Sequence, residues 1–194
     1  AGNVSPASDT FSLVIDLTPP TITMTGADVT VAHSSTYTEP GVSAQDTVDG
    51  PVSVNISHSV NTSIVGTYQV NYSATDASGN TGTASRIVSV TDQTDPVITL
   101  SGLATVTVEA ATSYLDAGAS STDAVDGNLT GSLVVENPIN DTTLMQPGSY
   151  TVTYTSTDSA GNKTVETRSV NVVDRTMPVI TLNGAETVDQ EAGG

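Results

Sequence analysis

A long-period sequence repeat is the strongest constraint on what this chain can fold into. The string DLTPPTITMTG starts at Asp16 and recurs as DQTDPVITLSG from Asp92 and as DRTMPVITLNG from Asp174. The three starts are separated by 76 and 82 residues, which is close to the length of one small β-sandwich. The chain is therefore expected to be a tandem array of similar modules.

The repeat also sets the expected domain boundaries. Residues 16–91 and 92–173 should form two complete modules, and residues 174–194 should hold the opening strand of a further, truncated module. The first residues resemble the end of a module, so residues 1–15 should hold the closing strand of a preceding one. These boundaries indicate a fragment of a longer array.

A period of two in the apolar pattern identifies the strand at the centre of each expected core. Apolar residues alternate with polar ones at Tyr68, Val70, Tyr72 and Ala74 in the first module and at Tyr150, Val152 and Tyr154 in the second. Such alternation is typical of a strand with one buried face. Each module opens just after a proline, which is tolerated at the first position of a strand. We therefore predict an all-β chain of tandem immunoglobulin-like β-sandwich modules, joined by short Pro-containing linkers.

The same alternation predicts which side chains fill the cores. The expected core residues are Ile22, Val31, Tyr68, Val70, Tyr72, Val88 and Val90 in the first module, and Ile98, Val108, Tyr150, Val152, Tyr154, Val170 and Val172 in the second.

Charge and composition exclude several classes of function. Four basic and 21 acidic residues give a net charge of −17, which repels nucleic acid and anionic membrane surfaces. No apolar run is long enough for direct membrane insertion. The chain has no Cys, so disulfides are excluded and a zinc site is disfavoured. An excess of carboxylates is instead well suited to divalent cations such as calcium.

Three motifs occur in the same order in both modules. The opening string above is followed by Asp-x-Val-Asp-Gly, at Asp46 and Asp123, and then by Gly-x-Tyr-x-Val-x-Tyr-x-x-Thr-Asp-x-x-Gly-Asn, from Gly66 and Gly148. Together they resemble the tandem bacterial Ig-like repeats, similar to cadherin and hyalin modules, of large secreted or RTX-type surface adhesins. The resemblance implies an extracellular or cell-surface location and a structural, extending role in cell adhesion, including biofilm formation.

Most of the conspicuous acidic residues fall in turns, where a metal ion could be bound. In an Ig-like sandwich, the entering segment and two of the hairpin loops reach the same pole, so their carboxylates should meet there. The candidate calcium ligands are Asp16, Asp46, Asp49, Asp76 and Asn80 at the first module, and Asp92, Asp95, Asp123, Asp126, Asp158 and Asn162 at the second. A calcium ion takes six to eight such oxygens and would stiffen each module junction.

A plainer interpretation of these acidic residues stays open. Asp, Asn and Gly are also common simply because they form turns. If calcium is bound, the first site should be the poorer by one carboxylate, because Pro19 replaces the second linker aspartate, Asp95.

Two other functions remain as alternatives to an extender. One is a carbohydrate-binding or accessory module of a secreted enzyme, so a surface glycan or a partner protein could be a ligand; the tyrosines on the predicted core face disfavour stacking on sugars. The other is a self-assembling sheath or filament subunit, in which residues 10–15 or 179–183 add a strand to another chain. Enzymatic activity is not indicated, because His33 and His58 have no counterparts in the second module.

Replacing Tyr154 by Ala tests the face assignment. If the ring is as buried as the alternation indicates, the substitution should lower the free energy of unfolding by about 3–5 kcal/mol. Urea denaturation would measure the change. A loss below about 1 kcal/mol would place the ring on the solvent face instead.

Overall fold

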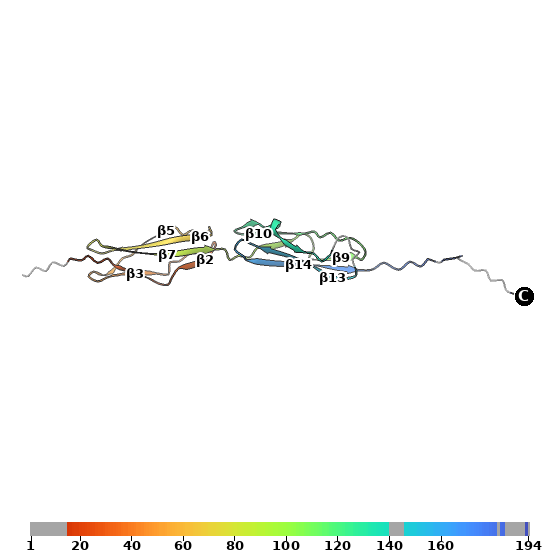
Figure 1. Cartoon of the computed structure of the whole chain (residues 1–194), viewed down its shortest axis with the longest axis horizontal. Helices are drawn as coiled ribbons and strands as arrows, with labels where there is room; N and C mark the ends of the chain where they lie inside the picture. The colour runs from red at the N-terminus through yellow and green to blue at the C-terminus, as the bar shows by residue number, and fades with distance from the viewer. Residues whose placement is uncertain (1–14, 140–145, 182, 185–192, 194) are drawn as a thin grey trace, which may run out of the picture. The chain divides into compact units, whose positions relative to one another are not determined.

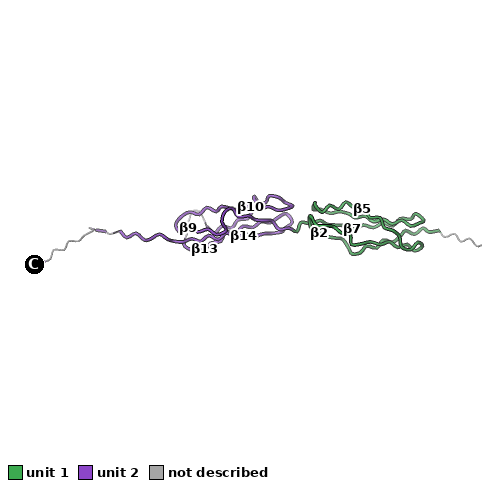
Figure 2. Tube along the Cα trace, turned by 180° about the vertical axis from the view of Figure 1, so that it is seen from behind, with its two compact units in different colours: residues 1–93 green, residues 94–194 purple. Residues whose placement is uncertain are grey.

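The computed structural model describes residues 15–139, 146–181, 183–184 and 193. Contacts between Cα atoms divide the chain into two compact units, unit 1 from Ala1 to Gln93 and unit 2 from Thr94 to Gly194 (Figure 2). This division falls two residues after the predicted start of the second module at Asp92. The described part contains strands and one short 3₁₀ helix, and none of its helices is long and apolar enough to cross a membrane.

Unit 1 is a sandwich of a three-stranded and a four-stranded sheet (Figure 1). The strands of the first sheet, in spatial order, are β1 (Thr21–Met24), β3 (Val42–Asp46) and β4 (Gly50–Val52). Those of the second sheet are β2 (Val29–Ala32), β7 (Thr81–Thr91), β6 (Gly66–Thr75) and β5 (Asn55–His58). All pairs are antiparallel except β2 with β7.

Unit 2 repeats this topology. Its three-stranded sheet has the spatial order β8 (Val97–Leu100), β10 (Ala119–Asp123) and β11 (Gly127–Asn128). Its four-stranded sheet contains β9 (Thr105–Glu109), β14 (Lys163–Val173), β13 (Gly148–Thr157) and β12 (Val134–Glu136), with the 3₁₀ turn η1 (Thr130–Ser132) before β12. The fold class predicted from the sequence is therefore confirmed.

The core of each unit lies between its two sheets, where the alternation placed it. Tyr72 and Tyr154 are 1% and 0% exposed, and the valine two residues before each of them, Val70 or Val152, is 0% exposed. The central hairpins β6–β7 and β13–β14 supply most of the fully buried side chains, and the strands of the smaller sheets contribute fewer. The hydrophobic effect of these thin cores is thus concentrated on one long hairpin per unit.

The terminal segments expected to belong to further modules are only partly described. Of residues 1–15, only Ile15 lies within the described residues, so the closing strand assigned to that segment stays a prediction. Residues 174–181 and 183–184 carry no strand, and the rest of the segment 174–194, apart from Gly193, lies outside the described part. The opening strand of a further module likewise stays a prediction.

The segment that enters unit 1 passes very close to the start of β7. A Cβ atom placed on Gly82 would lie 2.0 Å from the carbonyl oxygen of Pro20, so no larger residue fits there without a shift of the backbone. Unit 2 has Thr164 at the equivalent position, and its hydroxyl donates a hydrogen bond to the carbonyl oxygen of Pro96 at 2.5 Å. Both units therefore hold the proline of the entering segment against the start of the last strand, unit 1 by close packing on a glycine and unit 2 by a hydrogen bond.

Gly82→Ala should destabilise unit 1 because the added methyl group collides with the Pro20 carbonyl. Forced overpacking of this kind costs about 1–3 kcal/mol. Urea unfolding would measure the loss. Gly131→Ala is the matched control, since a Cβ there meets nothing within 4 Å. Equal stabilities for the two variants would show that the segment at Pro20 moves aside freely.

Candidate metal-binding sites

Carboxylates from three separate segments meet at one pole of unit 1. Asp16 lies in the entering segment, Asp46 ends β3, and Asp76 follows β6. Each offers one oxygen, and these three oxygens lie within 4.8 Å of one another. The convergence of loops expected for this pole is therefore observed for these three residues.

The Asp-x-Val-Asp-Gly motif forms a tight turn that fixes the second of these carboxylates. Asp46 Oδ1 accepts hydrogen bonds from the backbone N–H groups of Val48 at 2.7 Å and Asp49 at 2.9 Å. Gly50 closes the turn with φ +75°, a conformation that glycine adopts without a steric penalty. Asp123 makes the same two bonds in unit 2, at 2.7 and 2.9 Å. The motif thus encodes the position of its first aspartate.

The Asp-x-x-Gly-Asn motif fixes the third carboxylate in a similar way. The backbone N–H and the side-chain amide of Asn80 donate to Oδ1 and Oδ2 of Asp76, both at 2.8 Å. Asn162 holds Asp158 by the same pair of bonds, at 2.8 and 2.7 Å. Neither asparagine is within the group of converging carboxylates, so each one supports the loop around its aspartate.

The entering segment is held by Asp16 itself and by a loop of the unit. Asp16 Oδ1 accepts hydrogen bonds from the backbone N–H of Thr18 at 3.0 Å and from its hydroxyl at 2.7 Å. The side-chain amide of Asn80 donates to the carbonyl oxygen of Asp16 at 3.2 Å. The carboxylate is therefore oriented by its own segment and by the loop after β6.

Two of these carboxylates each keep one oxygen without a hydrogen bond. Asp46 is only 3% exposed, and its Oδ2 atom and that of Asp16 are shielded from solvent and have no hydrogen-bond partner among the described residues. The backbone N–H groups of Asp49 and Val48 hold the pKa of Asp46 below its ordinary value, so this carboxyl is ionised at neutral pH. A buried charged oxygen without a donor is costly unless a cation compensates it.

The spacing of the oxygens fits a calcium ion. Calcium binds oxygens at about 2.3–2.6 Å, so two ligands on opposite sides of one ion lie about 5 Å apart. The mutual distances within 4.8 Å in the Asp16 group agree with this spacing.

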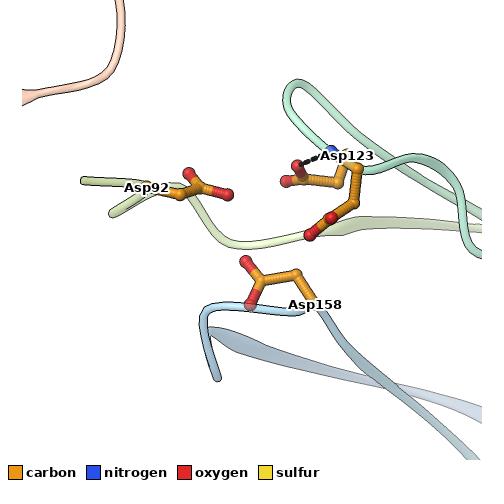
Figure 3. Close-up of side chains that lie close together, drawn as sticks. Asp92, Asp123 and Asp158 are labelled. Atoms are coloured by element: carbon orange, nitrogen blue, oxygen red, sulfur yellow. Dashed lines mark hydrogen bonds between the residues drawn. The ribbon is translucent and has the colours of Figure 1, made fainter. Parts of the chain in front are cut away.

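Unit 2 has a corresponding group with one more carboxylate. Oxygens of Asp123, Asp126 and Asp158 lie within 4.8 Å of one another and of an oxygen of Asp92, which stands just before the first residue of this unit. In Figure 3 the side chains of Asp92, Asp123 and Asp158 point toward one another. Asp126 is oriented by Ser159, whose backbone N–H and hydroxyl donate to it at 2.8–3.0 Å.

Seven of the nine candidate aspartates fall into these two groups, and Asp49 and Asp95 do not. The two candidate asparagines, Asn80 and Asn162, each bond to an aspartate of one group. The first group has one carboxylate fewer than the second, but the sequence argument placed the difference at Pro19 and Asp95. The structure places it at Asp49, which is exposed and accepts a hydrogen bond from the Ala77 N–H at 2.8 Å. Ligation of a metal by any of the eleven stays a prediction.

Sequence reasoning missed a buried ionic network in unit 2. Arg168 is 1% exposed and lies on the core-facing side of β14, in phase with Val170 and Val172. Its guanidinium donates to Asp116 Oδ1 at 2.5 Å and to the carbonyl oxygens of Ser101 and Leu103. The sequence feature that could have revealed the network is an arginine at a position of the strand where the alternation expects an apolar side chain.

Two tyrosines complete the network. The hydroxyls of Tyr114 and Tyr154 donate to the two oxygens of Asp116. Burial raises the pKa of Asp116, but the hydrogen bonds from Tyr154, Tyr114 and Arg168 outweigh it and hold the pKa below its ordinary value. Tyr114 is thus buried, at 6% exposed, and bonded.

Unit 1 has a looser version of the same network. Arg86, 1% exposed, lies 3.6 Å from the Glu39 carboxylate and donates to the Thr25 carbonyl oxygen at 2.8 Å. Tyr37 and Tyr72 donate to one oxygen of Glu39. Arg86 Nε and one terminal nitrogen have no hydrogen-bond partner among the described residues. The longer glutamate therefore leaves its arginine less fully satisfied than aspartate does.

Comparison with known proteins identifies both units. The family model described as "Bacterial surface protein, Ig-like domain" matches residues 22–90 and again residues 98–172. Both matches lie within the modules that the sequence repeat predicted.

Two curated relatives contain similar sequence. An uncharacterized 81.3 kDa protein of Acholeplasma phage L2 is 31% identical over 173 residues, which cover 82% of this chain. Hyalin of Lytechinus variegatus is 39% identical over 129 residues, which cover 61% of it. The chain spans only 23% of the length of each relative.

Among solved structures, a protocadherin ectodomain is similar over most of this chain. The protocadherin gammaB7 EC3-6 cis-dimer structure aligns with 81% of this chain and 48% of its own, with a TM-score of 0.37 and 16% identity.

Asp116→Asn should destabilise unit 2 at neutral pH by about 3–5 kcal/mol, because it leaves Arg168 buried without its counter-charge. The folded pKa of Asp116 is lowered, so its contribution is present above the ordinary value of 3.8 and is lost as the pH falls through the folded pKa. The stability difference between wild type and variant should therefore shrink below pH 3.8. Urea unfolding at several pH values measures this difference.

The exposed Glu136 provides the control for that charge change. Glu136→Gln should alter the free energy of unfolding by no more than about 0.5 kcal/mol at any pH. A loss as small as this for Asp116→Asn would mean that the ion pair contributes nothing net to stability.

Proposed function

The chain belongs to the family of bacterial surface Ig-like domains, and we propose that its two units are non-catalytic extender modules of a secreted or cell-surface adhesin, each stiffened by calcium where the chain enters it. Such modules hold a binding region of a larger protein away from the cell. The family description and the tandem repeat both support this role. An extracellular location supplies the calcium that the proposal needs.

The observation that carries the calcium proposal is the pair of shielded Oδ2 atoms of Asp16 and Asp46. Each of these aspartates uses Oδ1 to bind its own loop, whereas its Oδ2 has no hydrogen-bond partner among the described residues. If these residues only formed turns, nothing would compensate the second oxygen. A hard divalent cation, which prefers carboxylate oxygens, would do so.

The proposed ion would act on the segment that enters the unit. Residues 15–20 form no strand, and their attachment to unit 1 depends on a few hydrogen bonds and on Pro20. An ion held by Asp16, Asp46 and Asp76 would add a strong tie between this segment and two loops, and would also reduce the repulsion among carboxylates. The same reasoning applies to Asp92 and the carboxylates of unit 2.

The affinity should suit a permanently occupied structural site. Extracellular calcium modules bind at roughly 10⁻⁴ to 10⁻³ M, which is near the calcium concentration outside cells. The self-assembly alternative depends on the terminal segments 10–15 and 179–183, whose described residues, 15, 179–181 and 183, carry no strand.

Calcium should slow global hydrogen exchange of unit 1, and Asp46→Asn should abolish this effect. With 10 mM calcium and a dissociation constant of about 1 mM, the expected stabilisation is about 1.4 kcal/mol, or roughly tenfold in exchange rate. Mass spectrometry of peptides from residues 21–91 measures the rate with calcium and with EDTA. Asp49→Asn carries the same charge change outside the group and should retain the calcium effect.

The same samples test stiffening. Small-angle scattering should show a narrower distribution of maximum dimensions with calcium for the wild type and for Asp49→Asn, but not when Asp46→Asn is combined with Asp123→Asn. If calcium does not change the exchange rates, these aspartates only form turns and bind no ion. Slower exchange without narrower scattering would support a bound ion but contradict the stiffening role.

A further inference from the structure

The outward face of the four-stranded sheet in unit 1 is hollowed and entirely uncharged. A shallow, open depression of about 480 Å³ lies over β5, β6 and β7, and its nine lining residues include no acid and no base. The depression is on the sheet face, whereas the carboxylate groups lie in loops and in the segments that enter the units.

Amide and hydroxyl side chains stand in two rows across these strands. The strand register places Asn55, Ser73 and Thr83 in one row and Ser57, Asn71 and Ser85 in the next. Neighbouring strands are about 4.8 Å apart, so each row presents three polar groups at that spacing. Gln69 extends the array along β6.

The side chains in these rows are available to a ligand. None of the six donates or accepts a side-chain hydrogen bond within the described residues, and five of them are exposed, with Ser73 partly so. Hydroxyl and amide groups can both donate and accept hydrogen bonds. The rows therefore match a ligand that carries many neutral groups of the same dual kind.

The same face of unit 2 also has a depression, of about 350 Å³, but its lining includes a charged residue, Glu136, although the strands have the same register. Val134 and Val165 flank Thr155 where unit 1 has Asn55 and Thr83 beside Ser73, and Glu136 replaces Ser57. Val134 and Val165 are 59% and 49% exposed, so these substitutions alter the surface and not the core. The unit thus supplies a natural control for the proposed surface.

We propose that the β5–β6–β7 face of unit 1 binds an uncharged polysaccharide. The strongly negative chain repels acidic glycans, and cations find better ligands in the carboxylate groups, which leaves neutral polyhydroxyl chains as the complementary class. The open depression suits an extended chain better than a small enclosed ligand. None of the six tyrosines is exposed to stack on a sugar ring, so the affinity of one face should be weak, on the order of 1 mM. This function goes beyond extension and does not depend on calcium.

The test uses the full chain labelled with ¹⁵N and three soluble neutral polysaccharides, dextran, mannan and galactan, with alginate as an anionic comparison. At least one neutral polysaccharide should shift NMR signals of β5, β6 and β7, including the side-chain amides of Asn55 and Asn71, while alginate should not. The triple variant Asn55→Val, Ser57→Glu and Thr83→Val, which copies unit 2 onto unit 1, should lose at least tenfold in affinity. Thr153→Val in unit 2 is the matched control and should bind as the wild type does.

Several outcomes would overturn the proposal. These are the absence of localised shifts with all three neutral polysaccharides, shifts that map to another surface, or unchanged binding by the triple variant. A stronger response to alginate would also contradict it. If the triple variant does not fold, Asn71→Asp decides the question, because it adds one charge at the centre of the face and should weaken binding by a similar factor.

Discussion

The buried ion pair between Arg168 and Asp116 is the constraint around which unit 2 is arranged. A guanidinium in a thin core is tolerated only if its donors are matched, and here they are matched by Asp116 and by the carbonyl oxygens of Ser101, Leu103 and Gly118. These acceptors lie at the end of β8 and just before β10, so the pair ties the two sheets together. It also fixes where β10 starts, and four residues later that strand ends at Asp123 in the carboxylate group.

The two ends of each unit use carboxylates in opposite ways. Asp116 is surrounded by donors from side chains and the backbone, so its charge is fully matched within the fold. Asp46 is matched on one oxygen only, although it is just 3% exposed. The first arrangement makes a self-sufficient core in a chain without cysteine. The second leaves a buried carboxylate oxygen whose negative charge a bound cation would compensate. This contrast supports the calcium proposal.

The sequence predicted what depends on local periodicity and repeat. Alternation identified Tyr72 and Tyr154 as core residues because a strand places every second side chain on one face. The same alternation contained Arg86 in phase with Val88, but an arginine is not expected in a core, and its partner Glu39 comes from a distant loop. The family resemblance is confirmed by the match to both units.

The composition of the carboxylate groups could not be predicted because it depends on loop conformation. Asp49 and Asp126 have the same place in the same motif, yet Asp126 is within its group and Asp49 is not. Each is held by the loop that follows the central strand, where Ala77 offers one N–H and Ser159 adds a hydroxyl. The spacing of aspartates within the motif does not reveal a difference of one hydroxyl group in a neighbouring loop.

The backbone hydrogen bonds to Oδ1 of Asp16, Asp46 and Asp123 affect how fast an ion could bind. Because Oδ1 already accepts backbone hydrogen bonds from its own loop, each of these carboxylates is in position before any ion arrives. Capture of an ion would then require no folding of the loops, so its rate would be set mainly by diffusion and by the ion's loss of water. A surface protein built in this way would respond to a change in its ionic surroundings almost without delay.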